Sequence, residues 1–464
     1  MLFNSYLYLF VFLPAVFAAY FLLHGAGWRK PAMVLLLFAS ILFYSYWNVI
    51  HLLRLLLLSL GFNFWLGRRL ARSAPGSRGR KGLLAVGLAA NVGALIYFKY
   101  TDFFIANINA ALGTDYPLLH ILLPLGISFF TFQEMAYLVD SYRGETEEYS
   151  FVNYALFVTF FPQLVAGPIV HHREMMSQFG RGDVGRMRFD NVARGLFILS
   201  IGLFKKVCVA DTFARWATPG FDQSASLGLA DAWITSLSYT AQLYYDFSGY
   251  TDMAIGAALL FNVALPINFN SPYKALDIQD FWRRWHMTLS RFLRDYLYVP
   301  LGGSRRGFAR TCINLFAVFL IGGIWHGAGW TFAAWGALHG AAMVIHLCWR
   351  RAGYRMPAPA AWLTTFLFVN VAWVFFRARS FDDALKVLKG MAGLSGGWHP
   401  ATGDALYAAL ALAVFVGVSV MTRNSVERLA AFRPSVPGLA AVCLMFGGAM
   451  LLMNRYSEFI YFNF

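Results

Sequence analysis

Residues 312–347 read CINLFAVFLIGGIWHGAGWTFAAWGALHGAAMVIHL, and this stretch decides the fold class. It holds two apolar runs, 312–326 and 328–347, joined at the sequence Trp325-His326-Gly327. A helix that spans a bilayer needs roughly 20 apolar residues, with a range of about 17–25. The second run has this length, whereas the first rises only about 22 Å. The pattern therefore predicts a membrane hairpin with His326 at its tip, inside the membrane.

Similar apolar runs recur along the chain and predict an all-α polytopic membrane protein. We expect about eleven to thirteen transmembrane or re-entrant helices, in a single integral-membrane domain over residues 1–464. The run over 232–265 is long and reads as interrupted. The candidate spans are approximately 5–23, 32–47, 51–67, 82–98, 121–139, 152–170, 192–210, 232–265, 312–326, 328–347, 360–376, 405–421 and 437–453.

The composition supports a membrane protein. Hydrophobic residues make up 59% of the chain and charged residues only 13%, whereas soluble domains carry about 25% charged residues. The net charge of +15 would suggest nucleic acid in a soluble protein. Here the basic residues lie in short loops, which favours the positive-inside rule and membrane lipid as a partner, with no nucleic acid. Four isolated cysteines are expected to be buried small hydrophobes rather than zinc or redox ligands: Cys208, Cys312, Cys348 and Cys443.

The loops predict the orientation of the chain. The segment 68–81 holds six basic residues and no acid, so we expect it in the cytoplasm. Three predicted helices precede it, which places the N-terminus on the periplasmic side. Counting the predicted helices places the loop 140–150 in the cytoplasm, and the basic residues of 173–188 indicate the same side for that segment. The run between them, 152–170, should therefore not cross the membrane completely. It contains two prolines and a glycine, which break helices, and we expect it to be re-entrant.

The longest polar interruption, residues 266–311, is expected to be an insertion at the cytoplasmic face. Within it, residues 281–293 (FWRRWHMTLSRFL) alternate aromatic and basic positions at near-helical spacing. This alternation predicts an amphipathic helix that lies in the membrane interface. A simple interface anchor would need no histidine, so it leaves His286 unexplained.

Ionisable residues inside apolar stretches are candidates for chemistry, because they are costly there. His326 is flanked by glycines that allow close approach, and histidine is the usual general base near neutral pH. On these residues alone, a hydrogen-bonded core histidine is an equal alternative. His339 and His346 share a helix face, but their spacing is poor for a metal pair, and we expect no metal site. Asp246 and Asp252 are expected to form a helix break that lines a cavity, in preference to a paired-acid hydrolase.

Several ordered motifs resemble the membrane-bound O-acyltransferase family, specifically its bacterial alginate O-acetylation branch. The resemblance covers nearly the whole chain, and several of its motifs are long. The matching pieces are Met1–Ser5, Pro124–Gln133, Phe161–Ile169, Asp246–Asp252, Asn268–Tyr273, Phe281–Gly303, Trp325–Gly327 and Phe459–Phe464.

This resemblance implies acyl transfer by a ring of membrane helices around a funnel or tunnel. It implies that His326 is the catalytic histidine, and that His286 orients the donor or stabilises the oxyanion. Trp325 joins Asp246 and Asp252 as a cavity-lining candidate. Acetyl-CoA is the expected donor substrate, entering from the cytoplasm, with no bound cofactor. Its phosphates would be held by Arg283, Arg284, Arg291 and Arg294.

The expected acceptor lies outside a bacterial inner membrane, on a periplasmic acceptor protein or SGNH-type acetyltransferase that works with polysaccharide export machinery. The expected product is an O-acetylated exopolysaccharide, alginate or cellulose. Peptidoglycan O-acetylation is an alternative, and D-alanyl transfer to teichoic acid a weaker one. A polytopic transporter of lipid-linked sugars would show inverted repeats. A non-enzymatic scaffold would leave His326 and His286 without a role.

Overall fold

The computed structural model describes residues 1–46, 51–146, 150–164, 167–180, 185–395, 403–453 and 459–460. Every regular element in these ranges is a helix, which confirms the all-α class. The chain packs as two compact units: residues 1–200 with 250–266, and residues 201–249 with 267–464.

Among the described residues, six helices are long and apolar enough to cross a membrane, which confirms a multi-pass protein. Several of the other predicted runs form helices of only 16–17 residues, and the run over 152–170 forms a helix of nine residues. Full-length spans are therefore fewer than the number of apolar runs. The six are Tyr8–Gly25, Arg78–Leu112, Phe308–His326, Trp330–Arg351, Ala358–Arg377 and Asp404–Met421.

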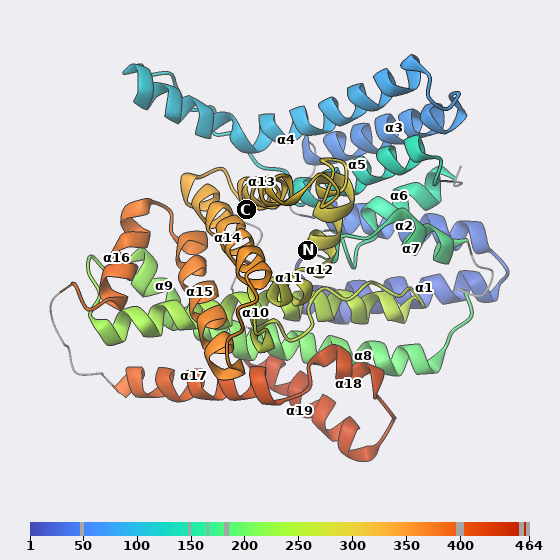
Figure 1. Cartoon of the computed structure of the whole chain (residues 1–464). Helices are drawn as coiled ribbons and strands as arrows, with labels where there is room; N and C mark the ends of the chain where they lie inside the picture. The colour runs from blue at the N-terminus through green and yellow to red at the C-terminus, as the bar shows by residue number, and fades with distance from the viewer. Residues whose placement is uncertain are drawn as a thin grey trace. The chain divides into compact units, whose positions relative to one another are not determined.

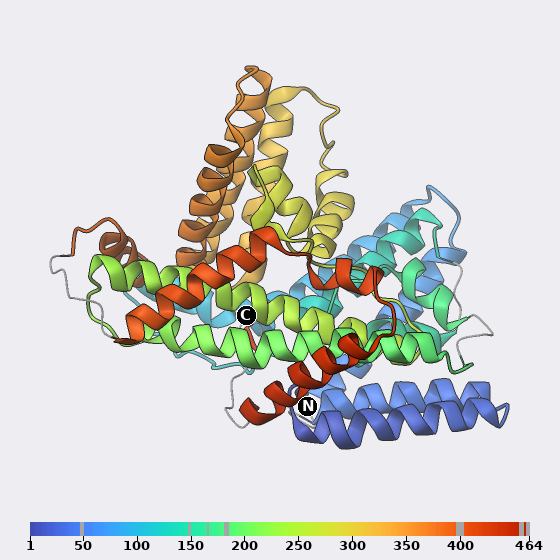
Figure 2. The same cartoon turned by 90° about the horizontal axis from the view of Figure 1, so that it is seen from below.

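The first unit contains two early helices, α1 and α2, that lie side by side (Figures 1 and 2). The helix α6 has nine residues and ends just before Pro162. This helix rises only about 14 Å, which is too little to cross a hydrocarbon core of about 30 Å. Its length agrees with the predicted re-entrant segment. Residues 165–166 and 181–184 lie outside the described part. The elements are η1 (Tyr8–Phe12), α1 (Leu13–Gly25), α2 (Arg29–Ser45), α3 (His51–Arg72), α4 (Arg78–Leu112), α5 (Ile127–Arg143), α6 (Phe151–Thr159), α7 (His172–Phe179) and the start of α8 (Phe189–Phe204).

The second unit carries the Trp-His-Gly hairpin. In both views α13 lies against α14, and α14 against α15 (Figures 1 and 2). The elements are η2 (Lys205–Ala210), α9 (Asp211–Asp222), part of α10 (Leu229–Leu260), η3 (Pro272–Lys274), α11 (Ile278–Arg284), α12 (Met287–Leu293), η4 (Arg294–Tyr298), α13 (Phe308–His326), α14 (Trp330–Arg351), α15 (Ala358–Arg377), α16 (Phe381–Met391), α17 (Gly403–Met421), α18 (Ser425–Ala430) and α19 (Val436–Leu452).

Glycines bring the two helices of the hairpin together. A Cβ atom added to Gly323 would lie 2.7 Å from the Cα of Gly336, and one added to Gly336 would lie 2.6 Å from the carbonyl oxygen of Phe319. Small residues at a membrane helix interface let the backbones approach closely and pack well. The predicted hairpin is therefore confirmed, and its close contact depends on glycine.

The prediction of an interruption near residues 246–252 is wrong. α10 runs continuously through both Asp246 and Asp252. The helix contains no proline, and the Lys206 ammonium lies 2.7 Å from the Asp246 carboxylate. A paired charge can stay inside a regular helix, because its partner compensates part of the desolvation cost.

The prediction of one amphipathic helix over 281–293 is also wrong. α11 ends at Arg284 and α12 begins at Met287, so the chain breaks at Trp285 and His286. Phe281 and Trp285 are buried rather than spread on a surface. The aromatic residues of this segment thus belong to the core of the unit.

The cysteines also differ from expectation. Cys208 and Cys312 are half-buried, and Cys348 and Cys443 are exposed. Lipid tails are as apolar as a protein core, so apolar side chains on outer helix faces of a membrane protein need no protein cover.

Candidate active site

His326 is the last residue of α13, where the chain turns from helix to extended backbone at Gly327 (φ −159°, ψ 151°). Its side chain is 4% exposed, although it lies at the tip of the hairpin. Rings surround it: the centroids of Trp325, Trp335 and Phe376 lie 4.9, 5.1 and 5.2 Å from that of His326. The second predicted site residue is close, since the His286 ring centroid lies 6.4 Å away.

His286 occupies the break between α11 and α12 in a left-handed conformation (φ 43°), and its side chain is fully buried. Two backbone bonds to a neighbouring segment hold this turn. Met287 N donates to the carbonyl oxygen of Asn268 at 2.9 Å, and Asn270 N donates to that of Arg284 at 2.9 Å. A non-glycine residue in this region is strained, and such strain clusters at functional sites.

Asn268 determines which nitrogen of His286 carries the proton. The Oδ1 atom of Asn268 accepts bonds from the backbone N–H and the hydroxyl of Thr288, at 3.2 and 2.9 Å. The Nδ1 of His286 lies 3.1 Å from the same oxygen. Because Oδ1 can only accept, Nδ1 must donate. Burial lowers the pKa of His286 to about 3, so the ring is neutral and its Nε2 presents a lone pair. Among the described residues, this Nε2 has no hydrogen-bond partner.

A second buried histidine, His339, lies in the same aromatic cluster. The indole Nε1–H of Trp282 donates to its Nδ1 at 3.1 Å, which assigns the ring proton of a neutral His339 to Nε2. The Trp335 ring lies between, with centroids 4.8 Å from His339 and 5.1 Å from His326. Trp335 and Asn268 were not among the predicted site residues. The sequence signal that could have identified Trp335 is its position four residues before His339, which places both side chains on one face of a predicted helix.

The two histidines considered as a metal pair, His339 and His346, have other partners. The Nδ1 of His339 is occupied by Trp282, and His346 lies 3.7 Å from the carboxylate of Asp277 instead. In the ranges that the structure describes, no group of three histidine, cysteine or acidic side chains could hold a metal ion.

Asp246 and Asp252, the two predicted carboxylates, lie in different units of the chain. Asp246 is buried in an ion cluster with Lys206, whose ammonium also lies 2.8 Å from Asp211. The second oxygen of Asp246 accepts a bond from Ile460 N at 3.0 Å, at the start of the terminal motif. Residues 461–464 of that motif are outside the described residues. Asp252 is buried in the other unit.

The four predicted donor-binding arginines are not equivalent. Arg284 binds Asp280 at 2.9 Å, and Arg294 binds Asp295 at 2.7 Å, so two guanidinium groups already have carboxylate partners. Arg291 is half-buried, whereas Arg283 is exposed on α11. Arg283 is therefore the member of the four that is best placed to meet an anion.

Comparisons with known proteins agree on the class of protein. The sequence profile described as MBOAT, the membrane-bound O-acyltransferase family, matches residues 9–381, which include both histidines of the site. A peptidoglycan O-acetyltransferase of Helicobacter pylori is 51% identical over 427 residues, or 85% of this chain and 80% of the relative. A protein of Pseudomonas aeruginosa named probable alginate O-acetylase AlgI is 40% identical over 398 residues, or 84% and 75%. A teichoic acid D-alanyltransferase of Bacillus subtilis is 26% identical over 276 residues, or 55% and 69%.

Proposed function

Because this chain belongs to the membrane-bound O-acyltransferase family and is an O-acyltransferase, we propose that it passes acetyl groups from cytoplasmic acetyl-CoA to a periplasmic acceptor across the bacterial inner membrane. The observation that carries this proposal is the pair of buried rings, His326 and His286, with centroids 6.4 Å apart. Relatives named for O-acetylation of polysaccharides support the acetyl group as the one transferred.

In the proposed reaction, His326 is the general base. It removes the proton from an acceptor hydroxyl, and the oxygen attacks the carbonyl carbon of the acetyl thioester. The C–O bond forms as the C–S bond breaks, and the proton passes from His326 to the leaving thiolate. The products are an acetyl ester and a free thiol, so atoms and charge balance without a further reactant.

The tautomer of His286 supports one of its two expected roles. An Nε2 lone pair accepts a hydrogen bond and cannot donate one to a developing oxyanion. We therefore propose that His286 orients a substrate. Its Nε2 accepts a hydrogen bond from a donor group, either the acceptor hydroxyl or an amide N–H of the acetyl donor. Asn268 fixes the ring for this task.

Trp335 is the proposed oxyanion donor. Its indole Nε1–H is buried and has no hydrogen-bond partner in the described part of the chain. Unpaired buried donors are costly, and each calls for an explanation. A donor fixed beside the base and waiting for a charge that develops in the transition state gives such an explanation.

Replacing Trp335 by Phe removes this N–H and keeps most of the ring. We expect kcat to fall about 10- to 100-fold with KM little changed, because the bond forms only in the transition state. The measurement is the initial rate of acetyl transfer at several acetyl-CoA concentrations. Trp330→Phe is the matched control, since Trp330 begins the same helix and is exposed. A change in KM alone would assign Trp335 to substrate binding instead.

We propose peptidoglycan as the acceptor polymer. The H. pylori peptidoglycan O-acetyltransferase is 51% identical to this chain, against 38–40% for five relatives named for alginate O-acetylation. Those five align over 84–86% of the chain, which makes an exopolysaccharide such as alginate the second candidate. A periplasmic SGNH-type acetyltransferase with export machinery would receive the acetyl group in either case.

Deleting the gene in its own bacterium tests the function and the acceptor together. We expect ester-linked acetate to disappear from peptidoglycan and to remain on secreted polysaccharide, with recovery on complementation. Loss from the secreted polymer alone would assign the exopolysaccharide. Unchanged acetate on both polymers would contradict O-acetylation and favour the transporter or the scaffold.

A further inference from the structure

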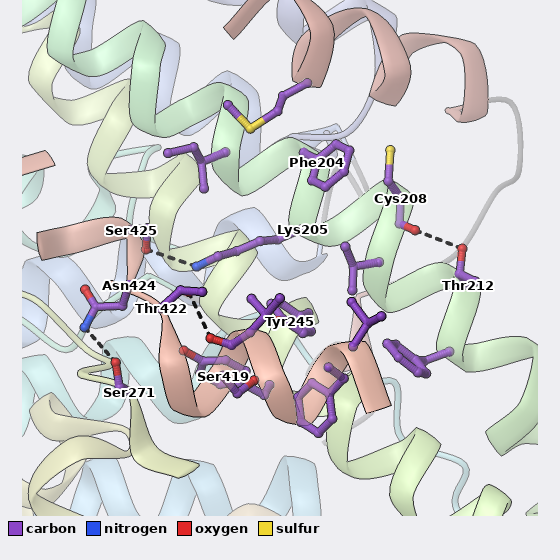
Figure 3. Close-up of a pocket in the computed structure, with 18 of the residues that line it drawn as sticks. Phe204, Lys205, Cys208, Thr212, Tyr245, Ser271, Ser419, Thr422, Asn424 and Ser425 are labelled. Atoms are coloured by element: carbon purple, nitrogen blue, oxygen red, sulfur yellow. Dashed lines mark hydrogen bonds between the residues drawn. The ribbon is translucent and has the colours of Figure 1, made fainter. Parts of the chain in front are cut away.

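A cavity of about 610 Å³ lies in the second unit, apart from the histidine pair. Small-molecule sites in proteins typically have volumes of about 300–1,000 Å³. Its body is apolar and is formed by the end of α8, by η2 and by one face of α17 (Figure 3). The apolar lining residues are Ile201, Phe204, Val209, Phe213, Ala411, Val414, Phe415, Val418 and Met445.

One end of the cavity is polar and positively charged. Lys205, Arg423 and Arg428 line it, and the described residues of the lining include no acid. Figure 3 shows Lys205 directed at Ser425, to whose hydroxyl its ammonium donates at 3.0 Å. The acid of α18, Glu427, accepts a bond from Asn424 N at 2.9 Å as part of the N-terminal cap of that helix. The charge at this end therefore suits an anion.

The segment 422–424, which carries Arg423 and leads into α18 with Arg428, is held in place. The Nδ2 atom of Asn424 donates to the hydroxyl of Ser271 at 3.0 Å and to Oδ1 of Asn270 at 2.9 Å. The ammonium of Lys274 donates to the carbonyl oxygen of Thr422 at 2.7 Å. A positive end that is fixed by neighbouring segments is preorganised for a ligand, because little ordering remains to be done on binding.

The apolar wall of the cavity includes side chains that the protein leaves exposed. α17 is long and apolar enough to cross a bilayer. Val414 lines the cavity and is 65% exposed, and its neighbour Leu410 is 57% exposed. Leu444 on α19 is 76% exposed. An apolar cavity beside lipid-facing helices is open to acyl chains from the bilayer.

We propose that this cavity binds one anionic phospholipid. An acyl chain lies along α17 and η2, and the phosphate lies between Lys205, Arg423 and Arg428. Guanidinium groups match the geometry of phosphate oxygens. A free phosphate would leave the apolar body empty, and the polar pantetheine arm of coenzyme A would lose its hydrogen bonds against an apolar wall. The combination of an apolar body with a cationic end favours the lipid.

The test is lipid retention by the purified protein, measured by native mass spectrometry with phosphatidylglycerol or phosphatidylcholine added. We expect the wild type to retain phosphatidylglycerol and the double variant Arg423→Gln/Arg428→Gln to bind it about tenfold more weakly, since each lost bond involves a charged group. Arg433→Gln is the charge-matched control, because Arg433 is exposed and outside the lining.

A second pair of variants tests the apolar body. Ala411→Trp fills the cavity and should reduce retention as strongly, whereas Ala413→Trp places the same ring two residues away on an exposed position outside the lining. Equal retention of the two lipids, or no effect of the double Arg variant, would overturn the proposal. Displacement of phosphatidylglycerol by coenzyme A or inorganic phosphate at equal concentration would overturn it as well.

The wild-type protein provides a test that needs no variant. Cys208 lines the cavity, whereas Cys443 is exposed and lies outside it. Phosphatidylglycerol should slow maleimide labelling of Cys208 and leave Cys443 unchanged, and phosphatidylcholine should affect neither thiol. Equal labelling of Cys208 with both lipids would contradict a lipid site.

Discussion

The variant His326→Ala loses acetyl transfer by about 10³-fold or more, while its amount in the membrane stays that of the wild type. General acid–base catalysis contributes about 10²- to 10⁴-fold, and we assign the neighbouring His286 to orientation rather than to proton removal. The measurement is the ester-linked acetate that mild base releases from the acceptor polymer, per copy of protein in the membrane.

The control for this variant lies on the same hairpin. His346 is in the next helix, half-buried near Asp277 and away from the aromatic cluster that encloses His326. We expect His346→Ala to keep nearly full activity. If His326→Ala were as active as His346→Ala, the general-base role of His326 would be wrong, and His286 would be the next candidate.

Replacing His286 separates stability from activity. Its backbone has φ 43°, a conformation that costs an L-residue about 1–2 kcal/mol and glycine almost nothing. We expect His286→Gly to be more stable than His286→Ala by about 1 kcal/mol, the reverse of the order in a helix. Both variants should lose activity by about 10²-fold, because both lack the Nε2 lone pair.

A second left-handed histidine serves as the control. His120 has φ 48° and is exposed, and it lies in the other unit. The His120→Gly variant should again be more stable than His120→Ala, with activity unchanged in both. Thermal unfolding in detergent gives the stability order, and polymer acetylation gives the activity. Full activity of His286→Gly would contradict the orienting role, whatever the stability.

Much of the fold follows from the sequence, because apolar run length and glycine placement act locally. The hairpin over 312–347 was predicted from two runs, and its glycines explain the close helix contact. The pairing of His326 with His286 was predicted only through the family resemblance. Nothing in the spacing of two histidines 40 residues apart, on separate elements, fixes the distance between them.

The two wrong predictions, a break near 246–252 and a single helix over 281–293, have physical causes that the local sequence pattern does not contain. α10 stays continuous because Lys206, 40 residues before Asp246, neutralises that carboxylate. The predicted helix over 281–293 breaks because Asn268 binds the turn at His286 through both its backbone and its side chain. Partners distant in sequence decide both cases, and a periodicity of 3.6 residues carries no information about them.

The glycine contact between α13 and α14 also bears on how the enzyme is made. His326 ends α13, but Trp335 and His339, which build its surroundings, come from α14, and that helix ends at Arg351. A nascent chain that ends before Trp335 has His326 without these neighbours, and an ionisable side chain in contact with lipid is costly. Gly323 and Gly336 let the two helices enter the bilayer as one packed pair. During biogenesis, therefore, insertion of the hairpin brings the α14 side chains of the site to His326 before α15 adds Phe376.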